Sequence, residues 1–241
     1  MKRLFSIILI LAILTTPIFS QVSGESLIKD LYQKWSSIKD LQMKFSITLY
    51  TYSTKGESLS QKMTMEMLYI SQPQVLRINF LEPALFAGQI VLLDSEKKLM
   101  RIYIPSTKQI MESELTQTST FTASLFNIPG VSGKEEGFTF DVTETIEKNQ
   151  KIYKITGKPN TPELKTIMSY FELFISKDEL KPLRFKMYDI EQRLYMDIIW
   201  LEIKINQNLS LNKIRTLPQG KAIKQKELQN ITPLPFFAPA K

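Results

Sequence analysis

Strict alternation of apolar and polar residues along most of the chain is the feature that most limits its fold. The stretches QMKFSITLYTY (42–52) and KMTMEMLYI (62–70) place an apolar side chain at every second position. Successive residues of a β-strand point to opposite faces, so this period of two predicts strands with one buried face. The pattern returns along the rest of the chain, in VLRINFLE, GQIVLLD, KKLMRIYIP, GFTFDVTE, QKIYKITG, IMSYFELFIS, KPLRFKMYDI and RLYMDIIWLEIKIN. We count ten or eleven strands and expect an antiparallel meander.

The segment before the first strand has a different period. In ESLIKDLYQKWSSI (25–38), the apolar residues recur at helical spacing with charged residues between them, which predicts one amphipathic helix. An open sheet of this many strands must curl, split or close. We therefore expect an α+β fold: a single large, curled antiparallel sheet, an open half-barrel, with helices covering its concave face.

The first twenty residues are typical of a secretory signal peptide. Lys2 and Arg3 precede an apolar run from Leu4 to Leu14, which is shorter than the roughly 20 residues of a membrane span. We place cleavage after Ser20 or Gly24, and we expect a soluble mature protein outside the cytoplasm, in the periplasm. The domain is expected to cover residues 25–219, followed by a proline-punctuated tail over 220–241.

The chain has neither cysteine nor histidine. Disulfides, thiolate or imidazole zinc sites, cysteine nucleophiles and Ser-His-Asp triads are therefore excluded. The formal charge of +7 is modest and spread over the strands, so we expect no nucleic-acid partner. An enzyme would need paired carboxylates, such as Glu82 with Asp94 or Asp189 with Asp197, but each lies at a strand end or on an outward face. We expect no enzyme, cofactor or metal.

Turn residues divide the strands, and two segments between strands are unusually apolar. Asn149 marks one turn, and Gly157, Pro159 and Asn160 mark the next. In FLEPALFAGQIVLLD (80–94), Pro83 and Gly88 interrupt an apolar run. From 106 to 134 the alternation fails, and we expect a short helix or loop over a hydrophobic surface instead of a strand.

The order of these features resembles the periplasmic lipoprotein carrier superfamily, which contains LolA- and LolB-like proteins and their outer-membrane lipoprotein-sorting relatives. The similarity covers about residues 26–219. It rests on MKFSITLYTY, on SQPQVLRINFLEP, on the strand, polar tip and strand of GQIVLLDSEKKLMRIYIPSTKQI, and on ISKDELKPLRFKMYDIEQR. The resemblance implies an open half-barrel that encloses a cavity for acyl chains.

The resemblance, together with the alternation, nominates two sets of residues. Unbranched methionines suit a cavity that accepts flexible chains, although they are also ordinary core residues. The lipid-cavity candidates are Met63, Met65, Met67, Leu76, Ile78, Phe80, Ile90 and Leu92; the rim and lid candidates are Leu85, Phe86, Phe121, Leu125, Phe126 and Ile128.

The partners implied by the resemblance are an acylated lipoprotein or lipid cargo, an inner-membrane donor complex and an outer-membrane acceptor, with the carrier itself a monomer. In the carrier proper, an arginine before a proline holds the lid shut; here that position is Gln72, and alternation places the nearby Arg77 on the outward face. A lipid-responsive envelope sensor, or a protein that binds glycolipids or other lipids, is the alternative with the same fold.

Overall fold

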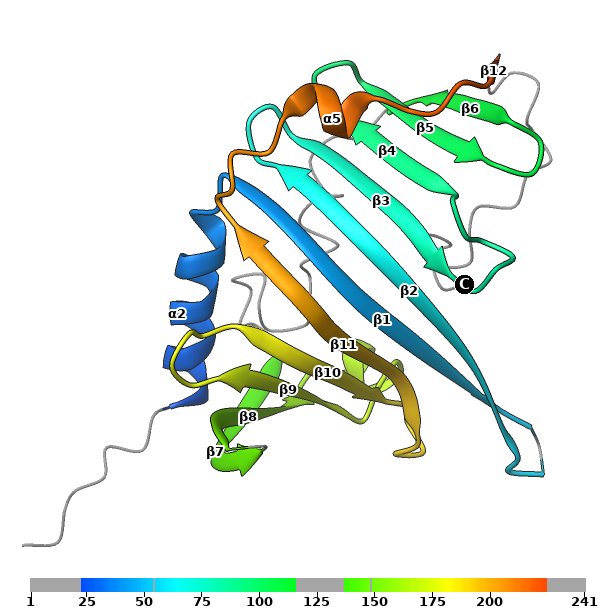
Figure 1. Ribbon diagram of the computed structural model, residues 1–241. Helices are drawn as coiled ribbons and strands as arrows, with labels where there is room; N and C mark the ends of the chain where they lie inside the picture. Colours follow the sequence, from blue (N-terminus) through cyan, green and yellow to red (C-terminus); the bar gives the residue numbers. More distant parts are fainter. Residues whose placement is uncertain (1–22, 54, 116–136, 148, 225–241) are drawn as a thin grey trace, which may run out of the picture.

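One twelve-stranded sheet forms almost the whole of the described chain (Figure 1). The computed structural model describes residues 23–53, 55–115, 137–147 and 149–224. The strands are β1 (Asp40–Tyr52), β2 (Ser58–Ile70), β3 (Val75–Glu82), β4 (Ile90–Asp94), β5 (Leu99–Ile104), β6 (Gln109–Glu114), β7 (Phe138–Glu147), β8 (Gln150–Pro159), β9 (Tyr170–Ser176), β10 (Pro182–Tyr188), β11 (Leu194–Ile205) and β12 (Lys221–Lys224). The helices are α2 (Gly24–Ser36), α4 (Pro162–Lys165) and α5 (Leu211–Arg215).

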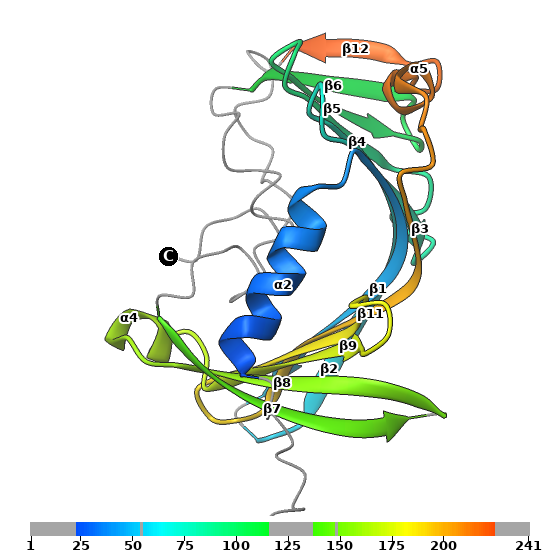
Figure 2. The same cartoon turned by 90° about the vertical axis from the view of Figure 1, so that its left-hand side faces the viewer.

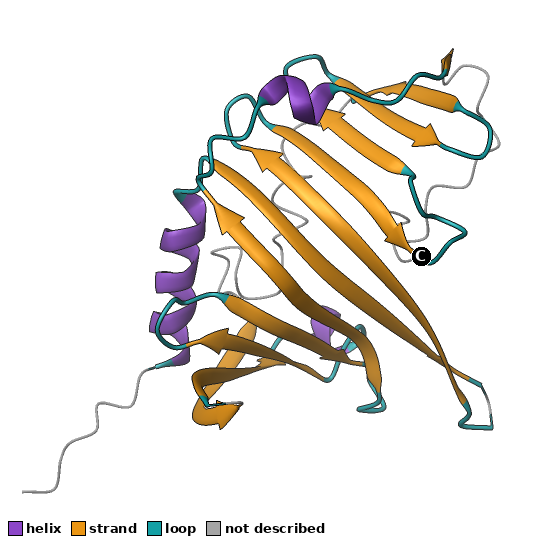
Figure 3. Cartoon of the chain, viewed as in Figure 1, coloured by secondary structure: helices purple, strands orange, loops and turns teal. Residues whose placement is uncertain are grey.

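The strand order is β12-β6-β5-β4-β3-β2-β1-β11-β10-β9-β8-β7. Strands β1 to β6 and β7 to β11 therefore form two meanders, which join where β1 pairs with β11. The sheet is open and strongly curled, and Figure 2 shows α2 lying on its concave side. The expected half-barrel class is confirmed, and Figure 3 shows the sheet together with the helices of the described residues.

Two of the twelve strands, β6 and β12, are absent from the ten alternating stretches of the sequence analysis. Strand β6 lies in the segment 106–134, which we expected to be irregular. It was missed because both of its faces are only half-buried and its polar residues hide the alternation. Strand β12 pairs with β6 in the parallel direction, so the sheet is not purely antiparallel. The sheet therefore continues past residue 219, where we expected the domain to end.

Helix α2 confirms the predicted N-terminal helix. The hydroxyl of Ser23 caps it by accepting a hydrogen bond from the Ser26 amide at 3.1 Å. Its apolar stripe packs on the concave face of β7 to β10 in a first core cluster, whose buried members are Leu27, Ile28, Leu31, Phe138, Tyr153, Ile155, Met168, Phe171, Leu173, Ile175 and Phe185. One half of the concave face is therefore covered by α2.

Gly157 lies inside β8 and not in the turn that we predicted for it. It pairs with Phe171 on β9, and a Cβ atom built on Gly157 would lie 2.2 Å from Cζ of that ring. The buried ring occupies the space where a side chain would stand, which is the physical reason for glycine here. The strand continues to Pro159, and only Asn160 belongs to the turn.

Within the described residues, no helix has both the length and the apolar character needed to cross a membrane. The predicted signal peptide over residues 1–20 and the tail from 225 onward lie outside the described residues.

Candidate functional site

The half of the concave face that lies beyond α2 is lined by a second core cluster, which we call the methionine face. Met63, Met65 and Met67 lie on one side of β2 and are at most 5% exposed. Register places them beside Ile47, Phe45 and Met43 of β1. The buried members of the methionine face are Ile38, Leu41, Met43, Phe45, Met63, Met65, Met67, Leu76, Ile78, Phe80, Val91 and Leu93.

Six of the eight nominated cavity residues belong to this face, namely Met63, Met65, Met67, Leu76, Ile78 and Phe80. The other two do not. Leu92 pairs with Arg77 and packs under α5 on the convex side, in a third cluster with Leu68, Val75 and Ile214. Ile90 pairs with Asn79 and lies two residues before Leu92 in β4, so its side chain points to the same convex side as that of Leu92.

The assignment of Ile90 and Leu92 to the cavity was wrong because all five residues of β4 are buried. A strand that is covered on both faces does not alternate, so its sequence does not reveal which residues face inward. Val91 and Leu93, which pair with Ile78 and Leu76, occupy the concave positions instead.

The two large side chains of the apolar turn between β3 and β4, Leu85 and Phe86, point in different directions. The Pro83 carbonyl accepts hydrogen bonds from the amides of Phe86 and Ala87, at 2.9 and 3.0 Å. Phe86 packs against the methionine face, with its ring centroid 6.3 Å from that of Phe80. Leu85 is 83% exposed. Phe86 therefore extends the methionine face at its rim, while Leu85 points to solvent.

The nominated lid residues Phe121, Leu125, Phe126 and Ile128 lie outside the described residues. Leu115, just before that segment, and Trp35, in the last turn of α2, are half-buried against the methionine face.

Arg77 lies on the convex face, as alternation predicted. Its Nη1 donates to the carbonyls of Lys213, Ile214 and Thr216 at the end of α5, and its Nε donates to Asn79 at 2.7 Å. Burial lowers the pKa of Arg77, and the nearby Glu66 carboxylate opposes this shift. Arg77 thus holds α5 and lies on the face of the sheet opposite the methionine face.

The four carboxylates considered for catalysis are each held by a partner. Glu82 accepts from the Thr64 hydroxyl at 2.6 Å, and Asp94 from Arg215 Nε at 2.7 Å. Asp197 accepts two hydrogen bonds from Arg184, and Asp189 is bonded by Arg193. Among the described residues, moreover, no three acidic side chains gather as a metal site would require. Each of the four carboxylates therefore takes part in a polar contact within the fold.

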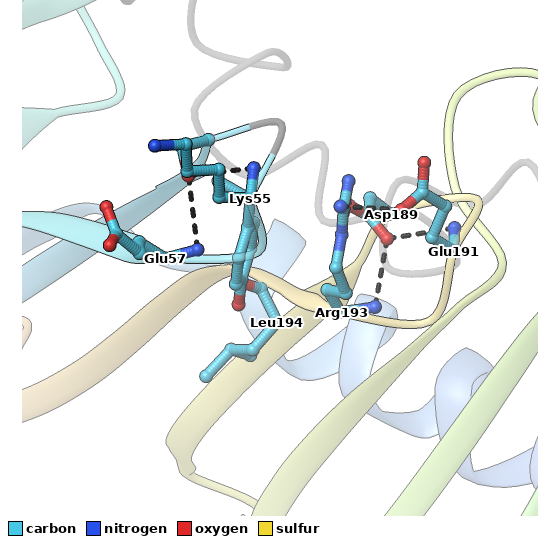
Figure 4. A network of polar contacts seen from close by, with 8 residues as sticks. Lys55, Glu57, Asp189, Glu191, Arg193 and Leu194 are labelled. Atoms are coloured by element: carbon cyan, nitrogen blue, oxygen red, sulfur yellow. Dashed lines mark hydrogen bonds and ion pairs between the residues drawn. The ribbon is translucent and has the colours of Figure 1, made fainter.

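The β1–β2 hairpin and the β10–β11 turn are fastened to each other at their ends (Figure 4). The Tyr52 hydroxyl donates to the Leu194 carbonyl at 2.9 Å, and the Arg193 guanidinium lies 4.6 Å from the centroid of the Tyr52 ring. Arg193 is fixed in turn by Asp189, whose carboxylate accepts from the Arg193 amide and Nε at 2.9 and 2.8 Å. The contact holds the long hairpin against the second meander.

Acid is expected to weaken this fastening. Burial alone would raise the pKa of Asp189, but the hydrogen bonds and charge of Arg193 outweigh it and hold the pKa below its ordinary 3.8. The stabilisation is therefore complete above the ordinary pKa and is lost as pH falls through the lower folded value. In denaturant unfolding, Asp189→Asn should cost up to about 1 kcal/mol at pH 7 and progressively less as the pH is lowered below 3.8.

Asp141→Asn is the matched control, because Asp141 forms an exposed ion pair with Lys158 at 3.1 Å. It should change the unfolding free energy by less than about 0.5 kcal/mol at neutral or at acid pH. A cost of Asp189→Asn that stays constant from neutral to acid pH would contradict the assignment.

No family model and no curated protein matches the sequence. Solved structures do match the fold. An uncharacterized conserved protein from Thermus thermophilus aligns with a TM-score of 0.54 and 17% identity, over 82% of this chain and 96% of that one. MucB in the Pseudomonas aeruginosa MucA/MucB complex aligns with a TM-score of 0.50 and 11% identity, over 83% of this chain and 62% of that one.

A LolA superfamily protein from Nitrosomonas europaea is also among the matches, with a TM-score of 0.37 and 12% identity over 81% of this chain and 98% of that one. At these identities the likeness concerns the fold alone. The open, curled sheet with an N-terminal helix on its concave side agrees with the half-barrel that the sequence resemblance implied, apart from the parallel strand β12. The chain therefore shares its fold with the Thermus thermophilus protein and with MucB.

Proposed function

We propose that this protein is a non-enzymatic periplasmic carrier whose methionine face binds the acyl chains of lipoproteins or related lipids. The observation that carries the proposal is the row of Met63, Met65 and Met67, continuous with Phe80 and Phe86 at the rim. Burying a methylene is worth about 0.8 kcal/mol, so a C16 chain gains on the order of 12 kcal/mol without any catalytic group. Methionine side chains adapt their shape to a flexible ligand at low cost.

In this proposal the cargo comes from an inner-membrane donor and is passed, by a monomeric carrier, to an acceptor at the outer membrane. Purified protein should then bind a fluorescent fatty acid and release it to a competing lipopeptide. Protein that is empty by native mass spectrometry and also ignores both probes would overturn the proposal.

Neighbouring residues on β2 provide a matched pair of variants. Met67 faces the methionine face and Leu68 faces the convex cluster under α5, and both are buried. Met67→Gln and Leu68→Gln each bury an unpaired amide and should destabilise the fold similarly, by about 2 kcal/mol. Only Met67→Gln should weaken fatty-acid binding, by at least tenfold, when both are measured well below their unfolding temperatures.

A lipid-responsive sensor is the second candidate, and the alignment with MucB, solved in a complex with MucA, favours it. The two functions differ in what becomes of the lipid. A carrier transfers a labelled lipopeptide from donor to acceptor vesicles, whereas a sensor retains its lipid and changes its affinity for a protein partner.

A further inference from the structure

The β1–β2 hairpin extends beyond the strands on either side of it. The pairing of β2 with β3 stops at Thr64 opposite Glu82, and the pairing of β1 with β11 stops at Leu49 opposite Met196. The described residues beyond these points, 50–53 and 55–63, form an arm, and Figure 1 shows the β1–β2 hairpin projecting at the lower right. The arm is a two-stranded ribbon with one edge along β1 and one along β2.

The β1 edge of the arm is fastened by the contacts of Tyr52 with Leu194 and Arg193. Its tip is closed internally: the Ser53 hydroxyl accepts from the amides of Lys55 and Glu57, both at 3.2 Å, and Gly56 takes a positive φ of 81°. The arm is therefore held in one position as a formed ribbon.

Within the part of the chain that the structure describes, no strand pairs with the β2 edge of the arm. The Ser53 amide donates to the Glu57 carbonyl at 2.9 Å, which marks the odd-numbered residues of β2 as those whose backbone groups face β1. The amides and carbonyls of Ser58, Ser60 and Lys62 consequently point away from β1, past the end of β3. Every residue from Ser58 to Lys62 is exposed, and Leu59 is 72% exposed.

A short strand edge with unpaired backbone groups complements one kind of partner, which is another extended strand. Lys62 is the one charged residue in Ser58–Lys62, and that stretch contains no proline, so it lacks most of the features that usually block pairing. On the concave side of β2 the row Met67, Met65 and Met63 continues through Gln61 to Leu59. The methionine face therefore leads directly onto the open edge.

We propose that the open β2 edge at Ser58–Lys62 binds, by strand addition, the extended peptide that follows the acylated terminus of the cargo. The inference rests on the proposed function. Acyl chains bound on the methionine face would bring the first residues of the attached peptide next to the start of the arm, where the concave row of β2 continues to Leu59. Backbone pairing suits such a carrier, since it is indifferent to the sequence of the peptide.

The test compares three probes: a fluorescent fatty acid, a dipalmitoyl-cysteinyl peptide with a neutral six-residue tail of serine and threonine, and the same lipopeptide with alternate tail amides methylated. The unmodified lipopeptide should bind about tenfold more tightly than the methylated one. Amide hydrogen exchange at Ser58, Ser60 and Lys62 should slow in its presence, and also with millimolar unlipidated tail peptide.

Ser60→Pro removes one outward amide without removing a bond to β1, and edge positions of this kind tolerate proline. It should abolish the tenfold advantage and leave fatty-acid binding unchanged, while Ser60→Ala, which removes only the hydroxyl, should change neither. Lys62→Pro provides a second variant if Ser60→Pro unfolds.

Equal affinity for both lipopeptides, unchanged exchange at these amides, or a dimer that pairs β2 with β2 of a second copy would overturn the inference. If the unmodified protein does not bind the fatty acid, the proposed function is overturned instead. Slower amide exchange at Ser58, Ser60 and Lys62 with the unlipidated peptide would still test strand addition at the β2 edge.

Discussion

Replacing Asp94 with alanine is expected to lower the free energy of unfolding by about 4 kcal/mol. The Asp94 side chain is fully buried at the end of β4 and accepts hydrogen bonds from Nε and Nη2 of Arg215 at 2.7 and 3.0 Å. Removing the carboxylate leaves a largely buried guanidinium without its main partner. It also releases the Lys97 amide, which donates to Asp94 at 3.1 Å.

The effect should be concentrated on α5, because Arg215 is the last residue of that helix. Hydrogen exchange should therefore show faster opening of residues 209–217 than of β8 and β9. Arg215→Ala should cost a similar amount, and the double variant should cost much less than the sum of the two.

Glu96→Ala is the matched control, since Glu96 also pairs with Arg215 but its side chain is 60% exposed. It should cost less than about 1 kcal/mol. If Asp94→Ala and Glu96→Ala proved equally mild, the buried pair would not be what fastens α5 to the sheet.

Gly157→Ala is expected to destabilise the protein by about 3 kcal/mol, at the upper end of the usual cost of overpacking. The new methyl group would meet the Phe171 ring at 2.2 Å. That ring cannot withdraw easily, because it is fully buried with ring centroids of Phe138 and Phe185 at 5.4 and 5.5 Å. Thermal and denaturant unfolding measure the loss.

Replacing Phe171 with a smaller residue should partly restore the stability of the Gly157→Ala variant. Phe171→Leu alone opens a cavity and costs stability, but combined with Gly157→Ala it should cost less than the sum of the two changes. Lys158→Ala, one position along β8 and exposed, should be nearly neutral. Strict additivity of Gly157→Ala and Phe171→Leu would show that the two side chains do not compete for this space.

Much of the fold could be predicted because local patterns carry it. Alternation in β1, β2 and β3 identified the strands and also the inward residues, since one face of each is buried and the other is mostly polar. The helical spacing of Leu27, Ile28 and Leu31 identified α2 in the same way. Six of the nominated cavity residues lie in these segments, and the structure places them together in one apolar cluster.

The errors fall where that local signal is missing. In β4 both faces are buried, so Ile90 and Leu92 were assigned the wrong phase. In β6 both faces are half-buried, so the strand was missed. Gly157 has the composition of a turn but lies in a strand, and the side chain that requires it, Phe171, is on a different strand.

By itself, the sequence determined the alternating strands, the N-terminal helix, the exclusion of cysteine and histidine chemistry and the methionine row of β2, because each depends on residues close together in the chain. The tertiary structure decided the pairing of β1 with β11, the parallel return of β12 and the clamp between Asp94 and Arg215, whose partners lie 121 positions apart. It also decided that β2 extends beyond the end of its pairing with β3, so that no described strand pairs with the β2 edge at Ser58–Lys62. Such features depend on which distant segments meet and where each one stops, and no local periodicity encodes either.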